Sequence, residues 1–339
     1  MRAFAPGRVN LIGEHTDYNA GLALAFAIRE GVTVHATALD EQRIEAVALD
    51  LDATDSVALD AIEPAAGWRA FVRGVTSELQ QAGVLLRGAR LEITGDVPLG
   101  GGLASSAALE VAVALALLAV ADAAPLDPLA LAVLCSRAEN EWAGVRSGVL
   151  DQTVSLLAEP DRCVQIDFRS LSVKTVPLEL GDFKLVTLDS GERHANAGSG
   201  YNERRDECAR ACEQLGVASL RDADLASVEQ LPAPLAGRAR HVIRENARVE
   251  EAAAALERSD MRALGALLDA SHASLRDDYE VSTPALDATV AYARESGALG
   301  ARMIGGGFGG HVLALLPPGV APPAGALEVR PGPGARLLG

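Results

Sequence analysis

Polar and charged residues cluster near the start of the chain, in the stretch PGRVNLIGEHTDYNAG at positions 6–21. This stretch contains Arg8, Glu14, His15 and Asp17. Taken singly, an arginine near an N-terminus is usually a solvated charge, and a histidine between two acids is often structural. Apolar residues interleave with these four, however, and they predict that the loop is held against a core. Side chains of these types held together form a candidate functional site.

A second stretch, PLGGGLASSAAL at positions 98–109, has the composition of an anion-binding loop. It follows a predicted strand and opens a predicted helix. Consecutive glycines let the backbone approach a ligand closely, and a helix start offers free N–H groups and the positive end of a dipole, which suits phosphate. The hydroxyl of Ser105 or Ser106 could ligate Mg²⁺. A flexible strand-to-helix turn capped by serine is the alternative interpretation.

Neither glycine-rich loop of the chain combines a standard nucleotide fingerprint with the structural context that the fingerprint requires. No Gly-Lys-Ser/Thr follows the 98–109 loop, as a Walker A loop requires, and Ser105 stands where the third glycine of a dinucleotide fingerprint belongs. A later loop, GGGFGG at 305–310, does satisfy G-x-G-x-x-G. A dinucleotide-binding loop needs a helix after it to bind the pyrophosphate, whereas an apolar strand follows this one. Dinucleotide binding is therefore not predicted, and a tight strand-to-strand turn is.

Hydrophobic periodicity predicts the elements that must position these loops. We expect an amphipathic helix from 68 to 82, a strand at 90–94 that leads into the glycine loop, and a long apolar helix that ends near 121. Asp127 followed by Pro128 predicts the start of a helix that runs to about 142. Further strands are predicted at 31–38, 43–49, 164–168, 185–188, 301–304 and 311–316, with a short helix starting near 151 and helices dominating 201–296.

Composition and charge narrow the class of protein. The chain has 339 residues, of which 49% are hydrophobic, and a change of pattern near residue 165 predicts two domains, 1–165 and 166–339. The net charge of −16 argues against a nucleic-acid partner, because phosphate neutralisation needs a basic surface. The longest strongly apolar run, 111–121, is too short to span a bilayer. Since the N-terminus also lacks a signal-peptide pattern, we expect a cytoplasmic protein with no membrane partner.

The four cysteines show no disulfide framework, and free thiols in a reducing cytoplasm are the preferred interpretation. Cys208 and Cys212 have helical i,i+4 spacing, which could in principle hold a metal ion. No second pair of cysteines or histidines has matching spacing, so a zinc site is not favoured.

Three sequence blocks, in this order, resemble the GHMP small-molecule kinases, which are named for galactokinase, homoserine kinase, mevalonate kinase and phosphomevalonate kinase. The blocks are GRVNLIGEHTDYNAG, PLGGGLASSAALEVA and IGGGFGGHVLALL. The second and third are typical of the superfamily, and the first looks like the signature of the galactokinases. The stretches AENEWAGVRSGVLDQ, GYNERRDEC and SLRDDYEVSTPALD agree, so the resemblance extends from position 6 to about 316.

The resemblance implies an α+β fold of two domains. The N-terminal domain would contain a left-handed βαβ crossover, against the usual right-handed rule, and the C-terminal domain would be ferredoxin-like and shortened at its C-terminus. The implied activity is Mg²⁺-dependent transfer of the ATP γ-phosphoryl group to the anomeric C1 hydroxyl of D-galactose by a monomer. Two alternatives stay open: a sugar-1-kinase acting on N-acetylgalactosamine or arabinose, and a non-catalytic galactose sensor.

The resemblance also implies roles for individual residues. Asp151 matches the proposed catalytic base, and Arg8 would stabilise developing negative charge and keep Asp151 ionised. Ser106 and Glu139 would hold Mg²⁺, and Trp68 would lie near the adenine. The phosphate cradle would comprise Gly100, Gly101, Gly102, Leu103, Ala104, Ser105 and Ser106. The sugar would contact Arg8, Glu14, His15, Thr16, Asp17, Gly148, Asp151 and Tyr201.

Several of these residues have simpler interpretations when the residue types are considered alone. An aspartate that starts a short helix, such as Asp151, is commonly a cap. Glu139 would be an ordinary surface carboxylate, and Trp68 a core residue. The third block also departs from the family, with Ile304 where threonine is usual and His311 where a small residue or cysteine is common. These departures leave the fine nucleotide contacts open.

Overall fold

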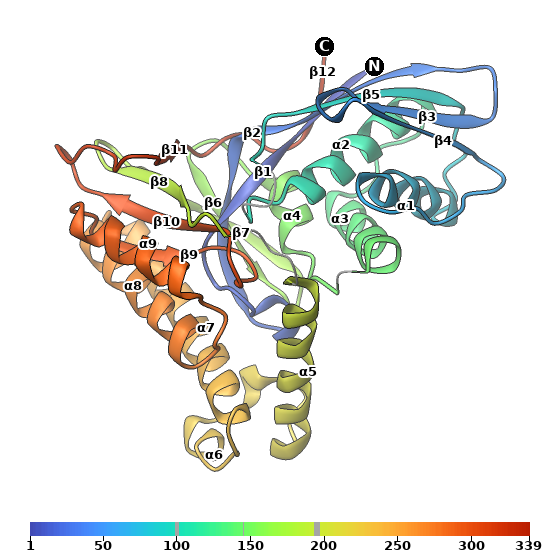
Figure 1. Ribbon diagram of the computed structural model, residues 1–339. Coiled ribbons are helices and arrows are strands. Elements are labelled where there is room, and N and C mark those ends of the chain that lie inside the picture. Colours follow the sequence, from blue (N-terminus) through green and yellow to red (C-terminus); the bar gives the residue numbers. More distant parts are fainter. Residues whose placement is uncertain (99–101, 145, 193–196) are drawn as a thin grey trace.

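The computed structural model describes residues 1–98, 102–144, 146–192 and 197–339, which form two β-sheets with helices packed against them (Figure 1). The larger sheet has the strand order β12-β1-β2-β5-β3-β4, and β6 and β7 extend it from β2. The smaller sheet has the order β11-β8-β10-β9. This mixture of helices and strands agrees with the expected α+β class.

The larger sheet is organised by one long strand, β2, which pairs along one edge with β1. On its other edge β2 pairs with β5 through residues 32–38 and with β6 through residues 22–25. The pair β3·β5 is parallel. The strands are β1 (Arg2–Ile12), β2 (Leu22–Ala38), β3 (Arg43–Ala48), β4 (Ala53–Ala58), β5 (Ala89–Gly95), β6 (Arg162–Asp167), β7 (Ser172–Pro177) and β12 (Arg336–Leu338).

Four helices lie together beneath the larger sheet in Figure 1: α1 (Trp68–Gln81), α2 (Ser105–Val120), α3 (Pro128–Ala138) and α4 (Leu150–Leu157). Helix α2 contacts β1 and β2 as well as the other three helices. It is buried on almost every side, which suits a sequence made mainly of alanine, leucine and valine. Because α2 starts at the glycine loop, its packing fixes where that loop lies.

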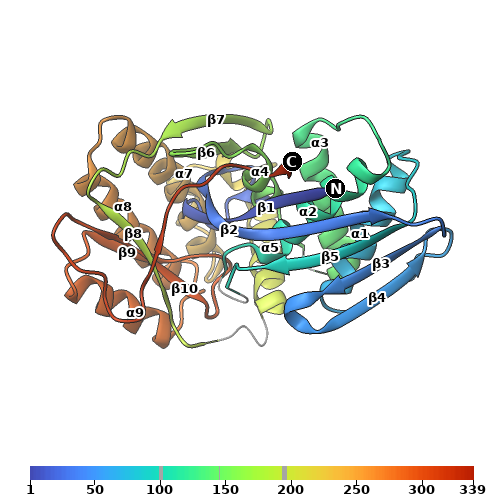
Figure 2. The same ribbon diagram turned by 90° about the horizontal axis from the view of Figure 1, so that it is seen from above.

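The smaller sheet is antiparallel throughout its described pairs and comprises β8 (Lys184–Asp189), β9 (Gly300–Met303), β10 (His311–Leu316) and β11 (Leu327–Val329). Its helices are α7 (Leu235–Glu257), α8 (Met261–Asp277) and α9 (Pro284–Glu295). Helix α7 contacts β2 of the larger sheet and also α8, which in turn contacts β9 of the smaller sheet. Helices α5 (Ala197–Leu215) and α6 (Leu225–Val228) extend away from the sheets in Figure 1. Seen from above, α8 and α9 lie on one side of the molecule and β3, β4 and α1 on the other (Figure 2).

The structure corrects three of the expected elements. The opening stretch is not a loop up to residue 21, because its first part belongs to β1, and β2 begins at Leu22 well before the expected start at 31. Most side chains in both strands are buried, so burial does not alternate and period-two patterning cannot reveal them. The helix expected to reach 142 ends as regular α-helix at Ala138 and continues as a π-helical turn, Glu139–Ala143.

The division of the chain at residue 165 stays a prediction, as does the handedness of the crossover. Strands β7 and β12 lie beyond that position and still belong to the larger sheet. Among the helices of the described ranges, none combines the length and the apolar character needed to cross a membrane.

Candidate active site

Residues from both halves of the chain line one pocket of ≈ 310 Å³. Its walls come from β1 and the loop after it, the start of α2, the π-helical turn with the start of α4, the first turns of α5, and the loop between β9 and β10. The lining residues are Arg8, Glu14, His15, Asp17, Gly102, Leu103, Ala104, Ser105, Ser106, Glu139, Ser147, Gly148, Leu150, Asp151, Tyr201, Gly305, Gly306 and Gly307. Most of the sequence-predicted site residues therefore meet in this pocket.

Arg8 and Asp151 form an ion pair in this pocket. Nε and Nη2 of Arg8 lie 2.8 and 2.7 Å from Oδ1 of Asp151. Burial lowers the pKa of Arg8, but the charges of Asp151 and then Glu14 outweigh it, so the pKa is raised and the guanidinium stays charged. The side chain of Asp151 is 25% exposed, against 8% for Arg8. Since Arg8 also donates to the carbonyl of Gly102, it connects this carboxylate with the glycine loop.

Asp17 receives hydrogen bonds from two other predicted site residues. Its Oδ2 accepts the N–H of Gly148 at 3.0 Å and the hydroxyl of Tyr201 at 3.3 Å. Burial raises the pKa of the Asp17 carboxyl, although these hydrogen bonds oppose the shift. A Cβ on residue 148 would lie only 2.2 Å from Oδ2. Because glycine has no Cβ, the Asp17 carboxylate can approach the backbone of residue 148 this closely.

His15 is held by protein groups at both ring nitrogens. Nε2 lies 3.2 Å from the carbonyl oxygen of Gly306, which can only accept, and Nδ1 lies 2.8 Å from the hydroxyl of Tyr18. Nε2 therefore carries the proton and Nδ1 accepts from Tyr18. The chain continues to the Tyr279 hydroxyl at 2.7 Å and from there to Cys208 at 3.1 Å. Burial lowers the pKa of His15 to about 3, so the ring is neutral and is fixed in one tautomer.

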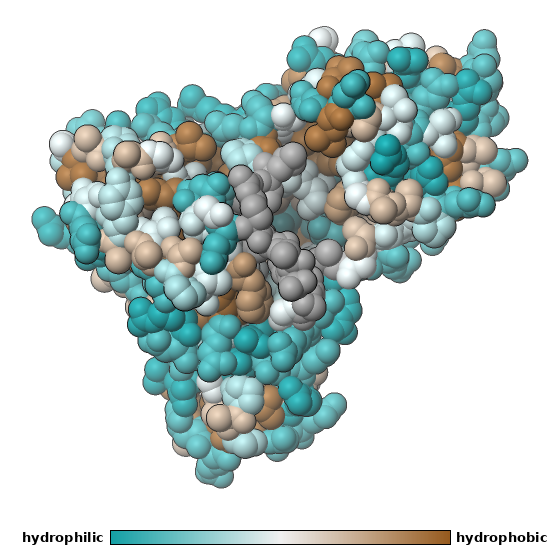
Figure 3. Space-filling view, viewed as in Figure 1, coloured by the Kyte–Doolittle hydropathy of each residue, from teal (hydrophilic) through white to brown (hydrophobic). Residues whose placement is uncertain are grey.

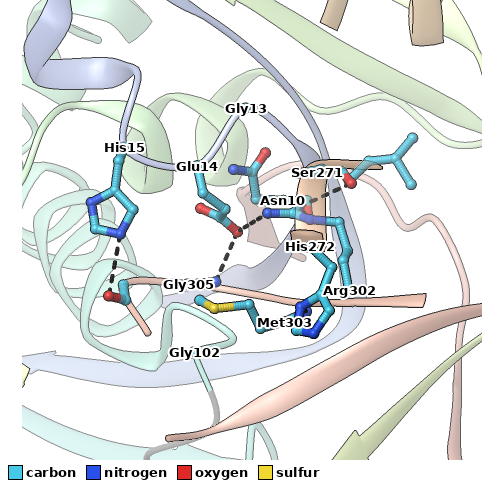
Figure 4. A network of polar contacts seen from close by, with 12 residues as sticks. Asn10, Gly13, Glu14, His15, Gly102, Ser271, His272, Arg302, Met303 and Gly305 are labelled. Carbon is cyan, nitrogen blue, oxygen red and sulfur yellow. Dashed lines mark hydrogen bonds and ion pairs between the residues drawn. The ribbon is translucent and has the colours of Figure 1, made fainter. Parts of the chain in front are cut away.

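Glu14 and Thr16 flank His15 in sequence but differ in their surroundings. Glu14 lines the pocket, and its Oε1 accepts the N–H of Gly305 at 2.8 Å (Figure 4). Thr16 is fully buried outside the pocket lining, and its hydroxyl lies 2.8 Å from the Gly13 carbonyl and 2.7 Å from the Leu22 carbonyl. The structure thus gives Thr16 the role of holding the loop against β2.

The described part of the phosphate loop, 102–106, lies at the start of α2 and lines the pocket. Ala104 adopts a left-handed conformation with φ 58, and Ser105 is the first helical residue. Leu103 is buried, and its carbonyl accepts the backbone N–H of Arg8 at 3.0 Å. The predicted cradle residues Gly100 and Gly101 lie outside the described residues.

Glu139 is buried in the π-helical turn and is not the surface carboxylate that residue type alone would predict. Its Oε1 accepts the hydroxyl of Ser106 at 3.1 Å, and its Oε2 accepts the hydroxyl of Ser147 at 2.6 Å and Nε2 of Gln152 at 3.1 Å. Burial raises the pKa of Glu139, and these donors oppose that shift. Ser106 and Glu139, the predicted metal ligands, are therefore adjacent.

A second pocket of ≈ 270 Å³ adjoins the first and shares Ser105 and Ser106 with it. Trp68 lines it and also packs on the core beneath the larger sheet, so the two interpretations of this residue do not exclude each other. The remaining lining residues are Val32, Ala48, Asp50, Leu51, Gly67, Phe71, Ile93, Gly95, Val97 and Leu109. Figure 3 shows apolar residues gathered over this part of the larger sheet.

The loop between β9 and β10 contributes more than sequence reasoning assigned to it. It is the predicted strand-to-strand turn, yet Gly305, Gly306 and Gly307 also line the pocket. Gly305 and Gly307 have φ values of 82 and 83, and a Cβ on Gly307 would lie 2.4 Å from the Val281 carbonyl oxygen. The run of glycines was the sequence signal that could have indicated this role. Only glycine readily combines a positive φ with such a close approach to neighbouring backbone.

Two family descriptions match the chain in agreement with this fold and site. "GHMP kinases N terminal domain" matches residues 70–159, and "GHMP kinases C terminal" matches residues 252–330. Together with the glycine loop at the start of α2, they define the class as a GHMP kinase, a phosphotransferase with ATP as co-substrate. A third description, "Galactokinase galactose-binding signature", matches residues 1–38.

Known proteins similar to the whole chain narrow the class further. The galactokinase of Actinobacillus succinogenes is 41% identical, over 94% of this chain and 85% of its own length. The galactokinase of Mycobacterium tuberculosis is 44% identical, over 92% and 88%. The structure of Lactococcus lactis galactokinase complexed with galactose superposes with a TM-score of 0.93 at 33% identity, covering 99% of this chain and 95% of that one. The chain belongs to the galactokinase family.

Mevalonate kinase from Methanococcus jannaschii has a TM-score of 0.70 at 18% identity, over 98% of both chains. At that identity the similarity shows a shared fold alone.

Proposed function

We propose that this protein transfers the γ-phosphoryl group of ATP to the C1 hydroxyl of D-galactose, giving galactose 1-phosphate and ADP. The observation that carries the proposal is the ion pair between Arg8 and Asp151, in a pocket that joins the galactose-binding signature to the glycine loop of α2. The galactose bound to the Lactococcus lactis relative supports galactose as the sugar.

Phosphoryl transfer depends mainly on positioning and on electrostatic stabilisation, so few groups need to take part in bond making. Asp151 has an exposed part that faces the pocket, and its carboxylate accepts the proton of the sugar hydroxyl. Arg8 holds that carboxylate in place through two contacts with its Oδ1. Because Arg8 also reaches the carbonyl of Gly102, its charge lies beside the phosphate loop, where negative charge grows during transfer.

The sugar lies against the carboxylates of Glu14 and Asp17, with Gly148 and Tyr201 at the same wall. Carboxylates held in fixed positions discriminate between sugar epimers, because a misplaced hydroxyl leaves a buried acceptor unpaired. His15 contributes differently from the sugar contact that the resemblance implies. Both of its nitrogens are engaged by protein groups, so its ring supplies a fixed wall and orients the neighbouring loops.

ATP places its phosphates on the loop at the start of α2 and its adenine in the apolar second pocket beside Trp68. When bound, Mg²⁺ would offset the charge of the phosphates. Ser106 and Glu139 suit this ion, since both present hard oxygen atoms. Oγ of Ser106 lies 3.1 Å from Oε1 of Glu139. Among the described residues no trio of histidine, cysteine, aspartate or glutamate forms an all-protein metal site. Mg²⁺ usually keeps several waters and binds substrate phosphates beside one or two protein ligands.

A panel of sugars tests the proposal. ADP release would be measured with galactose, N-acetylgalactosamine, arabinose and glucose, and phosphorus NMR would locate the phosphate on the product. We expect galactose to give the highest kcat/KM and the phosphate to lie on C1. Phosphate on another carbon refutes the proposal, and turnover of a different sugar alone favours another sugar-1-kinase. Galactose binding without ADP release favours a sensor. The cytoplasmic location and the monomeric state stay predictions.

A further inference from the structure

An arginine of the smaller sheet lies behind the sugar-binding wall of the pocket. Arg302 belongs to β9 and is 0% exposed. Its Nη1 lies 3.2 Å from the carbonyl oxygen of Asn10 and 3.0 Å from that of Leu11, and its Nη2 lies 3.4 Å from Oε1 of Glu14 (Figure 4). All three contacts fall on the short segment that carries β1 into the pocket. Arg302 thus fixes this segment from the other half of the chain.

Glu14 is held at one oxygen while it lines the pocket. The N–H of Gly305 and Nη2 of Arg302 both reach its Oε1. Burial raises the pKa of Glu14, and the charges of Arg302 and then Arg8 lower it. Arg8 already donates a hydrogen bond to Asp151. Arg302 is therefore the main positive charge opposite the Glu14 carboxylate.

Stability alone does not account for an arginine at this position. Withdrawing a guanidinium from water is costly, and apolar residues of similar volume often replace a buried ion pair without loss of stability. Among the described residues none accepts a hydrogen bond from Nε or Nη2 of Arg302, so the 3.4 Å contact of Nη2 with Glu14 is an ion pair without a hydrogen bond. The contacts that Arg302 does make are with Asn10, Leu11 and Glu14, in the segment that leads into the pocket.

We propose that Arg302 is a positioning residue of the sugar site: its buried guanidinium holds the Glu14 carboxylate so that it is aimed into the pocket, and galactose affinity therefore depends on a side chain of β9. The inference rests on the proposed function, in which Glu14 contacts the sugar. Arg302 itself touches no substrate and acts through Glu14.

A double-mutant cycle tests this role. Galactose affinity is measured by isothermal titration calorimetry for wild type, Arg302→Met, Glu14→Gln and the double variant, and KM for galactose and for ATP is measured by ADP release. We expect Arg302→Met to weaken galactose binding at least about 10-fold, or about 1.4 kcal/mol, with KM for ATP within about 2-fold of wild type. In the Glu14→Gln background, Arg302→Met should change galactose affinity less than about 2-fold, because the group it acts through has lost its charge.

The pH dependence of galactose affinity is a second measurement. It would not change if Arg302 only stabilised the fold. Galactose binding weakens as pH falls and Glu14 takes up a proton. Without the neighbouring cation the pKa of Glu14 rises further, so Arg302→Met should lose galactose affinity at a higher pH than wild type. The other titratable or charged groups of this network, on β1, α7 and α8, are Arg8, His241, Glu245, Arg248 and His272.

A matched control variant shows whether the effect of Arg302→Met comes from losing any buried ion pair or from losing the contact with Glu14. Arg73 on α1 pairs with the largely buried Asp55 at 2.6 Å, and neither residue lines the two pockets described above. Arg73→Met should lower Tm and leave galactose affinity unchanged. If Arg302→Met does not fold, Arg302→Lys is taken through the same cycle, where we expect a smaller loss that again disappears in the Glu14→Gln background.

The outcomes distinguish the two proposals. Absence of galactose turnover by the wild-type protein refutes the proposed function. Wild-type turnover combined with effects of Arg302 and Glu14 that simply add overturns the role of Arg302 alone. A loss shared equally between galactose and ATP, or an unshifted pH profile, also overturns it.

Discussion

Replacing Gly148 by alanine perturbs the sugar site through a contact whose size can be read from the structure. A Cβ at this position would lie 2.2 Å from Oδ2 of Asp17 and 2.7 Å from its Cγ, whereas Cβ contacts shorter than 3.0 Å essentially never occur. Asp17 must therefore withdraw by about 0.8 Å or more. The residue has no positive φ, so the backbone itself accepts alanine and the clash is the main perturbation.

Withdrawal of Asp17 breaks its hydrogen bonds with the N–H of Gly148 and the hydroxyl of Tyr201, which are 3.0 and 3.3 Å long. A misplacement of about 1 Å in a site that orients a substrate costs about 100-fold in rate. We therefore expect kcat/KM for galactose to fall about 100-fold in Gly148→Ala, equivalent to about 2.7 kcal/mol of transition-state stabilisation. KM for ATP should stay within about 2-fold, because the loop at α2 that we propose for its phosphates is separate from this contact.

Steady-state ADP release over a range of galactose and ATP concentrations measures both quantities. Gly144→Ala is the control, since Gly144 lies nearby, has a φ of 74, and leaves open space where a Cβ would point. It should lower Tm through backbone strain of about 1–2 kcal/mol and keep wild-type kcat/KM. Wild-type kcat/KM in Gly148→Ala would refute the reasoning, as would an equal loss in both glycine variants.

Three further predictions concern the chemistry, the metal ion and the histidine. Asp151→Asn should abolish turnover and leave galactose binding measurable by calorimetry, and full activity would rule out Asp151 as the base. Glu139→Ala should raise the Mg²⁺ concentration needed for half-maximal activity about 10-fold or more, while an unchanged Mg²⁺ titration would remove it from the metal site. Tyr18→Phe removes the donor to Nδ1 of His15, so galactose affinity should fall about 5-fold. The ¹⁵N shifts of His15 should change with it, and unaltered shifts would contradict the hydrogen-bond direction assigned above.

The loops of the site were predictable because their signals are local. Three glycines before Leu103 and the serines after it predict a phosphate loop at a helix start from neighbouring residues alone. The segment from Glu14 to Asp17 could likewise be assigned to the site from its residue types. Thr16 shows the limit of that approach: it shares the segment, but its side chain turns inward to two backbone carbonyls. Which side chains of a polar segment face a ligand depends on the path of the backbone.

Burial decided several roles against the expectation from residue type. Glu139 lies in a π-helical turn with three hydrogen-bond donors around its carboxylate, which no helical periodicity indicates. His15 is a member of a chain of hydrogen bonds that ends at Cys208. For Cys208 the sequence favoured a free thiol over a metal pairing with Cys212, and neither interpretation indicates a hydrogen bond with Tyr279.

The sequence by itself determined where a ligand-binding backbone is possible, because glycine content, helix starts and polar residue types act over a few neighbouring positions. Only the tertiary structure decided which charges meet. Arg8 pairs with Asp151 across the packing of β1 on α4, and Arg302 reaches Glu14 across a buried core to which both sheets contribute side chains. The physical reason is that the energy of a buried charge depends on its distance to partners far away in sequence, and those distances exist only once both sheets are packed.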